Sequence, residues 1–203
     1  MSDHRPRSID EFDASYQAAA KPPWDIDRPQ PALAAAANQF SGRVLDVGCG
    51  TGEHALLAAS RGLSALGVDA APTAISRAQE KARQRGLDAR FFVADALKLG
   101  TLGEQFDTVV DCGLFHVFDD DDRDRYVRSL ADVVSPGARV FLLCFSDRQP
   151  GDWGPRRIRE DDLRASFADG WDVDSIEPTT LELTFQPEPV QSWRGTITRL
   201  PDA

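Results

Sequence analysis

Short apolar segments alternate with longer amphipathic segments from Arg43 onward. The apolar runs have the length of strands and are rich in Val, Leu and Phe, so they predict buried β-strands, and the segments between them predict helices. The predicted strands are Val44–Val47, Ala65–Val68, Arg90–Val93, Phe106–Val110 and Ala138–Phe145. The predicted helices are Gly52–Arg61, Pro72–Arg85 and Asp121–Val134. This alternation favours an α/β fold with a doubly wound, mostly parallel sheet that helices cover on both faces.

The segment before this alternation is different. Ser8 and Glu11 have the spacing of a capping box, which predicts a helix over Ile9–Ala20. Pro31 suits the first turn of a second helix that runs to about Phe40. Between these helices, the proline-rich connector 22–31 favours extended backbone and lacks hydrogen-bond donors, so we expect it to lie over the domain without joining the sheet.

The alternation also stops after Phe145. Asp161–Ala168 looks helical and Trp171–Ile176 strand-like. Thr180–Phe185 and Ser192–Leu200 are β-rich and close in sequence, so they predict an antiparallel hairpin at the end of the sheet. With 203 residues, the chain has the length of a single domain.

Charge and hydropathy narrow the possible partners. The net charge of −10 argues against a nucleic-acid partner, because such binding depends on clustered Lys and Arg. The start of the chain, Met1–Arg7, is polar, and the longest apolar runs have the length of strands, so we expect neither a signal peptide nor a membrane segment. A cytoplasmic protein is expected, either a monomer or a homodimer.

The cysteines and one run of aspartates are expected to have structural roles. Cys49, Cys112 and Cys144 are widely spaced and match neither a disulfide framework nor a zinc site, so we expect reduced core residues. The run 119–122 consists of four aspartates just before a predicted helix. Consecutive side chains cannot all face one ion, so we interpret the run as helix capping and predict no metal site.

The segment Val44–Gly52 combines a strand with alternating glycines and predicts a cradle for a nucleotide-type cofactor. Glycine tolerates positive φ, and the amides of the following helix favour a negative group. A dinucleotide fingerprint requires a glycine where Glu53 stands, so a pyrophosphate would meet Glu53 and Asp46. S-adenosyl-L-methionine, with an ammonium and a sulfonium beside one carboxylate, is the better electrostatic match.

Acidic residues stand at the ends of four predicted strands: Asp46 in the tail of the first, Asp69 and Asp111 closing the second and fourth, and Asp95 after the third. In a doubly wound sheet, ligands bind outside the carboxyl ends of the strands, where these side chains would gather. A carboxylate after the second strand can accept both hydroxyls of a ribose, and one after the third can accept an adenine amine. Each could also cap a helix or form a turn, and that alternative stays open.

The chain resembles the class I S-adenosylmethionine-dependent methyltransferases. The resemblance rests on Val44–Gly52, Gly67–Asp69, Phe92–Ala96, Phe106–Asp111 and Pro136–Val140, which are similar to the successive motifs of that family. It implies a Rossmann-like sheet of seven strands, the last antiparallel. It also implies that the cofactor contacts the glycine loop (Gly48, Cys49, Gly50 and Gly52 above Asp46), Asp69 with Ala70, Asp95 with Ala96, and Asp111 with Cys112.

A second resemblance lies upstream. Residues 23–31 are similar to the segment that precedes the core in thiopurine, thiol and halide methyltransferases and in bacterial small-heterocycle methyltransferases. It implies that Trp24 and Arg28 lie over the cofactor, in an N-terminal arm (1–42) that covers a catalytic core (43–203). Alternatively, Trp24 only fastens the proline-rich segment to the core.

The acceptor is expected to be a small aromatic or heterocyclic molecule that is methylated at sulfur, nitrogen or oxygen. Methyl transfer needs alignment and exclusion of water, and a base only when the acceptor arrives protonated. His116 is the candidate base, with a structural histidine as the alternative, and Phe115, His116 and Trp153 are expected to line the acceptor pocket. Two other functions remain open: a cofactor-binding protein without turnover, and a dinucleotide-dependent oxidoreductase.

Overall fold

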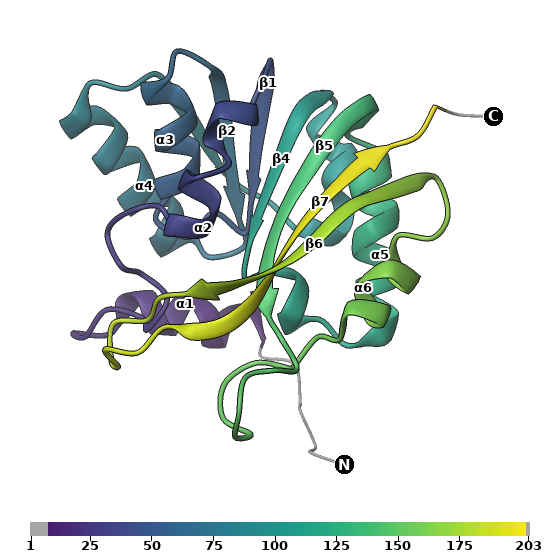
Figure 1. Ribbon diagram of the computed structural model, residues 1–203. Helices are drawn as coiled ribbons and strands as arrows, with labels where there is room; N and C mark the ends of the chain where they lie inside the picture. The colour runs from purple at the N-terminus through teal and green to yellow at the C-terminus, as the bar shows by residue number, and fades with distance from the viewer. Residues whose placement is uncertain (1–7, 202–203) are drawn as a thin grey trace.

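The computed structural model describes residues 8–201 and contains one sheet of seven strands (Figure 1). The order across the sheet is β3-β2-β1-β4-β5-β7-β6. β7 is antiparallel to both of its neighbours, and the other pairs are parallel. The predicted fold, including the antiparallel last strand, is confirmed. The strands are β1 (Arg43–Val47), β2 (Ser64–Asp69), β3 (Ala89–Val93), β4 (Phe106–Cys112), β5 (Val134–Phe145), β6 (Trp171–Leu181) and β7 (Val190–Arg199).

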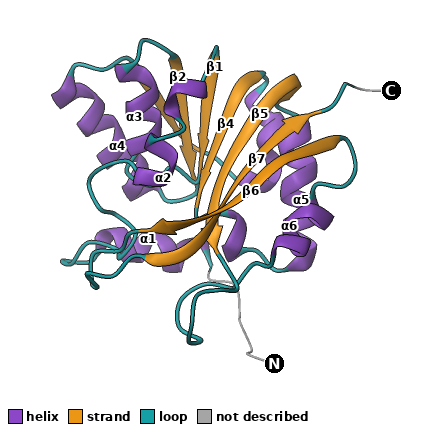
Figure 2. Cartoon of the chain, viewed as in Figure 1, coloured by secondary structure: helices purple, strands orange, loops and turns teal. Residues whose placement is uncertain are grey.

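Helices cover both faces of the sheet (Figure 2). One apolar core lies between the sheet and the side that carries α2, α3 and α4, and another lies between the sheet and α5 and α6. The helices are α1 (Ile9–Gln17), α2 (Pro31–Ala34), α3 (Glu53–Ser60), α4 (Pro72–Arg85), α5 (Asp120–Ala131) and α6 (Glu160–Ser166), with 3₁₀ segments η1 (Ala37–Gln39), η2 (Ala96–Leu102) and η3 (Phe115–Val117).

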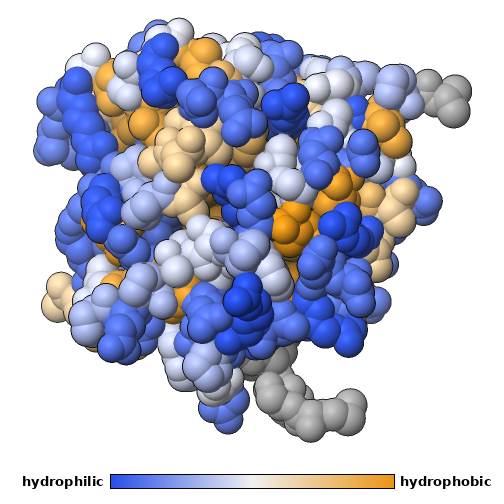
Figure 3. All heavy atoms as spheres, viewed as in Figure 1, coloured by the Kyte–Doolittle hydropathy of each residue, from blue (hydrophilic) through white to orange (hydrophobic). Residues whose placement is uncertain are grey.

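Strand β5 shows why the two cores form. Val140, Leu142 and Cys144 point into one core, whereas Phe141 and Leu143 point into the other, and all five are fully buried. A strand covered on both faces needs apolar residues at every position, which is the pattern in the sequence. The face of the molecule in Figure 3 is mainly hydrophilic, with separate apolar patches.

Several predicted boundaries were wrong. The helix expected to reach Val134 ends at Ala131, because Val134 begins β5 and pairs with Phe106. The helix expected from Pro31 to Phe40 divides into α2 and η1, and the first helix ends at Gln17.

The segment expected to be a separate strand, Thr180–Phe185, is not one. A single strand, β6, runs through Leu181, and Phe185 lies in the loop that follows. β6 lies at the edge of the sheet, where polar residues and Pro178 do not interrupt it. Its pairing with β7 confirms the antiparallel hairpin.

The connector between α1 and α2 lies against the segment that follows β6. The amide of Thr184 donates to the carbonyl of Pro23 at 2.8 Å. The Gln30 side chain exchanges two hydrogen bonds of 2.9 Å with the backbone of Glu182. As predicted, the connector covers the core without adding a strand, and it meets the β6–β7 hairpin at one end of the sheet (Figure 1).

Within residues 8–201, no helix is long and apolar enough to cross a membrane. The polar segment 1–7, on which the expectation of no signal peptide rests, lies outside the described residues.

Candidate active site

The glycine loop lies between the end of β1 and the start of α3. Gly48, Gly50 and Gly52 all have positive φ, at 66°, 53° and 87°. A Cβ on Gly52 would lie 2.6 Å from the Phe91 ring, and a Cβ on Gly50 would lie 2.8 Å from the Tyr16 hydroxyl. Both the backbone conformation and the close neighbours therefore require glycine, as expected for a cradle.

Asp46 lies beneath this loop and is completely buried. Its Oδ2 accepts the Ala55 amide of α3 at 3.0 Å, whereas its Oδ1 is buried without a hydrogen-bond partner. Burial raises the pKa of Asp46 to about 7, opposed by the Ala55 hydrogen bond and reinforced by the nearby carboxylates Asp69 and Asp111. An unpaired carboxylate oxygen at this position suits a cationic group of a ligand.

Asp69 connects the end of β2 to the glycine loop. Its Oδ2 accepts the Gly50 amide and its Oδ1 accepts the Ala71 amide, both at 2.8 Å. Burial raises the pKa of Asp69, although these backbone hydrogen bonds oppose the rise. Asp69 therefore shapes the loop, and its contact with a ribose, together with that of Ala70, stays a prediction.

The turn after β3 lies next to Asp69. The Ala94 amide donates to the Asp69 carbonyl at 3.0 Å. Asp95 caps η2 by accepting the Leu97 amide at 2.9 Å, and its other oxygen lies 3.6 Å from Lys98 Nζ. The structure thus brings Asp69, Asp95 and Ala96 to one edge of the sheet, as predicted from the parallel topology.

Asp111 anchors the turn after β4 from a fully buried position. It accepts the amides of Leu114 and Phe115 at 2.9 and 3.3 Å and the Tyr126 hydroxyl at 2.9 Å. Burial raises its pKa to about 6, and these hydrogen bonds oppose the rise. A Cβ on Gly48 would lie 3.1 Å from the Leu114 side chain, so this turn borders the glycine loop.

The three cysteines are free thiols, as predicted. Cys49 lies in the glycine loop, Cys112 at the end of β4 and Cys144 within β5. Burial raises the pKa of each thiol well above its usual value, which keeps all three protonated.

Tyr16 of the N-terminal segment lies against the glycine loop, and Trp24 packs on Tyr16. Trp24 Nε1 donates to the Tyr16 hydroxyl at 2.8 Å, and the two rings meet edge to face. Both pack against Ala71 and Ala74. The sequence interpretation named Trp24 but missed Tyr16, although Tyr16 is the buried residue of the predicted first helix.

Two charged residues make ion pairs that the sequence did not predict. The Arg28 guanidinium pairs with Glu182 and its side chain is about half exposed, so the contact of Arg28 with the cofactor stays a prediction. Glu53 does not face the ligand edge, because Arg85 binds both of its oxygens at 2.8 Å and Lys81 binds one. These cations lower the pKa of Glu53 despite its burial. The glycine spacing still disfavours a dinucleotide, whereas the Glu53 carboxylate is already neutralised by these cations.

Phe115 does not line a pocket. Its ring is fully buried, stacks on Phe167 with a centroid distance of 5.9 Å, and lies 4.9 Å from the Arg123 guanidinium. The 3₁₀ turn η3 directs Phe115 into the core, whereas the next residue faces β5.

His116 is held by the backbone of β5. Its Nδ1 accepts the Phe145 amide at 2.9 Å, and its ring meets the Phe145 ring at 5.0 Å. A neutral imidazole that accepts at Nδ1 carries its proton on Nε2. In this state Nε2 is a donor, which argues against the expected role of His116 as a base.

Trp153 belongs to an aromatic cluster, defined here as Phe145, Trp153 and Phe185. The Trp153 ring lies 5.9 Å from Phe145 and 5.6 Å from Phe185, with edge-to-face geometry. Arg157 lies near the Phe145 and Trp153 rings and donates to backbone carbonyls of the same loop, including that of Trp153 at 2.9 Å. Trp153 and Phe185 remain exposed at 37% and 59%. Phe185 was missed because it comes from the loop after β6.

The acidic run forms a helix cap, as predicted. Asp119 accepts the Asp122 amide at 2.9 Å, and Asp120 pairs with Arg156 at 2.6 Å. No group of three or more metal-ligating side chains with metal-site geometry occurs in residues 8–201.

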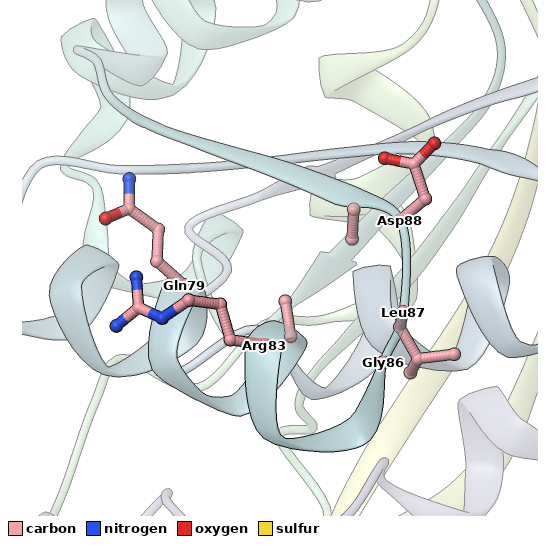
Figure 4. Close-up of a pocket in the computed structure, with 7 residues that line it drawn as sticks. Gln79, Arg83, Gly86, Leu87 and Asp88 are labelled. Atoms are coloured by element: carbon pink, nitrogen blue, oxygen red, sulfur yellow. The ribbon is translucent and has the colours of Figure 1, made fainter.

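A shallow hollow of about 470 Å³ lies elsewhere (Figure 4). Gln79, Arg83, Gly86, Leu87 and Asp88 line it, at the C-terminal end of α4 and just before β3. This is the amino edge of the sheet, opposite the strand ends that carry the acids, so the hollow is separate from the candidate site.

The charge of Asp46 should cost stability. Its pKa of about 7 lies far above the usual 3.8, so the folded state retains a proton that the unfolded chain releases as pH rises from about 4 to 7. Asp46→Asn keeps an oxygen for Ala55 and removes the charge. We expect the difference in melting temperature between the variant and the wild type to shift in favour of the variant by about 10 °C between pH 4 and pH 8. Calorimetric melts at the two pH values measure this difference, and a constant difference would contradict the assignment.

Comparisons with known proteins agree with this geometry. A family model described as a methyltransferase domain matches residues 44–137. A 2-heptyl-1-hydroxyquinolin-4(1H)-one methyltransferase from Mycobacteroides abscessus is 39% identical over 183 residues, which cover 85% of this chain and 81% of the relative.

Solved structures share the fold. One, described as "Conversion of a Disulfide Bond into a Thioacetal Group during Echinomycin Biosynthesis", has a TM-score of 0.88 and 39% identity, and the match covers 97% of this chain and 94% of that chain. A magnesium protoporphyrin IX methyltransferase from Synechocystis with bound S-adenosylmethionine has a TM-score of 0.64 at 22% identity, covering 83% of this chain and 75% of that chain. The chain belongs to the class I S-adenosylmethionine-dependent methyltransferases.

Proposed function

We propose that the chain methylates a planar aromatic or heterocyclic small molecule at a weakly acidic hydroxyl or thiol. The observation that carries this proposal is the cluster of Phe145, Trp153 and Phe185 beside His116. Aromatic rings that present edges and faces to solvent favour a flat apolar ligand. The net charge of −10 supports a small molecule over a nucleic acid.

The residues at the glycine loop fit the cofactor. When bound, S-adenosyl-L-methionine supplies an electrophilic methyl group on a sulfonium that leaves as a neutral thioether. Asp46 Oδ1 offers an unpaired carboxylate oxygen to a cation, and the positive-φ glycines permit close approach. Asp69 and Asp95 would accept hydrogen bonds from the ribose and the adenine, in the predicted roles. Cys49 and Cys112 would contribute apolar walls.

The N-terminal arm would close over this site. Trp24 fixes the orientation of the Tyr16 hydroxyl by donating to its oxygen at 2.8 Å, so the Tyr16 proton must point elsewhere. The hydroxyl lies against Gly50, and Asp69 is close enough to help raise its pKa, after burial. We propose that this O–H donates to the carboxylate of the cofactor, while the indole of Trp24 excludes water.

His116 would bind the acceptor as a hydrogen-bond donor. Because Nδ1 accepts the Phe145 amide, the protonated Nε2 can stabilise an oxyanion or a thiolate but cannot remove its proton. The acceptor would therefore ionise in solution before methylation, as thiols and acidic heterocyclic hydroxyls do. One relative supports this class, since it is named for a hydroxyquinolinone, which carries a heterocyclic hydroxyl.

The Tyr16 assignment can be tested through the cofactor alone. Removing a hydrogen bond to a charged group should cost about 1.5–3 kcal/mol, so Tyr16→Phe should weaken S-adenosylhomocysteine binding by about tenfold or more. Methylthioadenosine, which lacks the amino acid portion, serves as the matched ligand, and its affinity should not change. Calorimetry with both ligands measures the effect. Equal losses for both would assign Tyr16 a purely structural role.

The acceptor class can be tested by mass spectrometry. The purified protein with S-adenosyl-L-methionine should add one methyl group to members of a panel of hydroxyquinolinones, phenols and aromatic thiols. Trp153→Ala should raise KM for these acceptors by about tenfold, because a ring contact is lost, while the affinity for S-adenosylhomocysteine stays unchanged. Methylation of proteins or nucleic acids, with every panel member refused, would disprove the proposal.

Two variants distinguish a hydrogen-bond donor from a base at His116. His116→Gln can retain a side-chain donor, so it should keep more activity than His116→Ala on the same acceptor. The rate should rise with pH through the pKa of each acceptor and shift when the acceptor is changed. If both variants lose activity equally and severely, and the rate of the wild type rises near pH 6.5 for every acceptor, His116 acts as a base.

A further inference from the structure

A lysine on α4 binds the outer side of the glycine loop. Lys81 Nζ lies 2.7 Å from Thr51 Oγ1 and 2.8 Å from Glu53 Oε1. Thr51 stands between Gly50 and Gly52, and Glu53 is the first residue of α3. The Lys81 side chain is only 18% exposed. One ammonium therefore joins α4 to both the loop and the helix after it.

The same ammonium also reaches the N-terminal arm. It lies 3.4 Å from Asp27 Oδ1 and 3.9 Å from Asp25 Oδ1. Thr51 completes the connection, because its hydroxyl donates to Asp25 Oδ1 at 3.0 Å. A lysine ammonium has three donors on a compact charge, and here the arm, the loop and α3 share them.

The turn at Asp25 and Asp27 is acidic, and Lys81 is the cation of α4 that meets it, whereas Lys21 pairs with Asp27 from within the arm. Asp25 is nine-tenths buried, and its carboxylate lies in the same cluster as Asp27 and Glu53, which carry the same charge. Asp27 has a φ of 57°, the one positive φ outside glycine in the described part of the chain. A strained, acidic turn beside another carboxylate would separate without a positive charge between them.

Apolar packing does not replace the ammonium at this point. A groove of about 450 Å³ lies between the arm and α4, and its lining is polar and charged, including Lys21, Asp25, Asp27, Thr51 and Lys81. Trp24 packs against the cluster of Tyr16, Ala71 and Ala74 on one side of this groove. Asp25 follows Trp24 directly, so the ion pair holds the backbone next to the indole.

We propose that Lys81 is a positioning residue that fastens the N-terminal arm to the glycine loop and so determines how tightly the enzyme retains its cofactor. This inference rests on the proposed function of the arm as a cover for the cofactor. Lys81 touches neither cofactor nor acceptor in this assignment. It acts through Asp25 and Thr51, which place Trp24 and Tyr16 over Gly50.

The direct test is Lys81→Met, which keeps the length of the side chain and removes the charge. We expect S-adenosylhomocysteine to bind about tenfold more weakly in calorimetry, because the buried carboxylates lose their cation. Hydrogen exchange should accelerate in residues 22–30 but not in the central strands. Turnover at saturating cofactor should stay within about twofold, so the loss should appear in KM for the cofactor and not in kcat.

Two variants of the same helix serve as controls. Arg85→Met removes a cation from the other side of Glu53 without touching the arm, and Arg83→Met removes an exposed charge. Both should leave the affinity for S-adenosylhomocysteine within about twofold of the wild type. If Arg85→Met weakens binding as much as Lys81→Met does, the effect passes through Glu53 and the proposal is wrong.

A charge rescue tests the electrostatic cause. Adding Asp25→Asn to Lys81→Met removes the unpaired buried charge but keeps an oxygen for the Thr51 hydroxyl, so the double variant should recover most of the lost affinity. If Lys81→Met does not fold, Asp25→Ala tests the contact from the arm, with the same expected loss. Normal binding and normal exchange in a folded Lys81→Met or Asp25→Ala variant would overturn the proposal. Wild-type protein that does not bind S-adenosylhomocysteine would instead refute the proposed cofactor site.

Discussion

Carboxylates at the strand ends hold the loops of the active site by accepting backbone amides, and the rest of the site depends on this constraint. Asp69 accepts from Gly50, Asp95 from Leu97 and Asp111 from Leu114. The neighbouring strand accepts the first amide of a loop, as Asp69 does for Ala94 and Leu143 does for Gly113, but the amides further along the loop need other acceptors. The acids supply them, and in doing so they bring four loops together at one edge of the sheet.

Asp46 differs from the other strand-end carboxylates because one of its oxygens is free to bind a ligand. One of its oxygens binds the Ala55 amide, and the other remains buried without a partner. Burial raises its pKa, so the ionised carboxylate in this position lowers the stability of the folded state. A positively charged ligand can offset that cost, because it supplies the charge that the protein itself does not place there. Stability and cofactor affinity should therefore oppose each other at this residue.

The N-terminal arm and the β6–β7 hairpin extend the site beyond the sheet. Pro23 and Gln30 bind the segment after Leu181, and Phe185 of the same segment contacts Trp153. The arm therefore contacts the segment that carries Phe185, and its Tyr16 hydroxyl lies against Gly50 of the glycine loop. Residues from both ends of the chain thus complete a site whose centre is built by the parallel strands.

The sequence alone determined the parts that depend on local pattern. Apolar runs specified the strands, glycine spacing specified the cradle, and the topology rules for parallel sheets placed Asp46, Asp69, Asp95 and Asp111 at one edge. Only the tertiary structure decided the direction of individual side chains. Phe115 enters the core, whereas His116 faces β5. Arg28 and Glu53 form ion pairs with residues that are distant in sequence. Tyr16, Lys81 and Phe185 join the site through contacts of the same long-range kind. Local pattern fixes which residues reach an edge, because strand and helix periodicity are properties of neighbouring residues. Which charges and rings then meet depends on packing between distant segments, and periodicity carries no information about that.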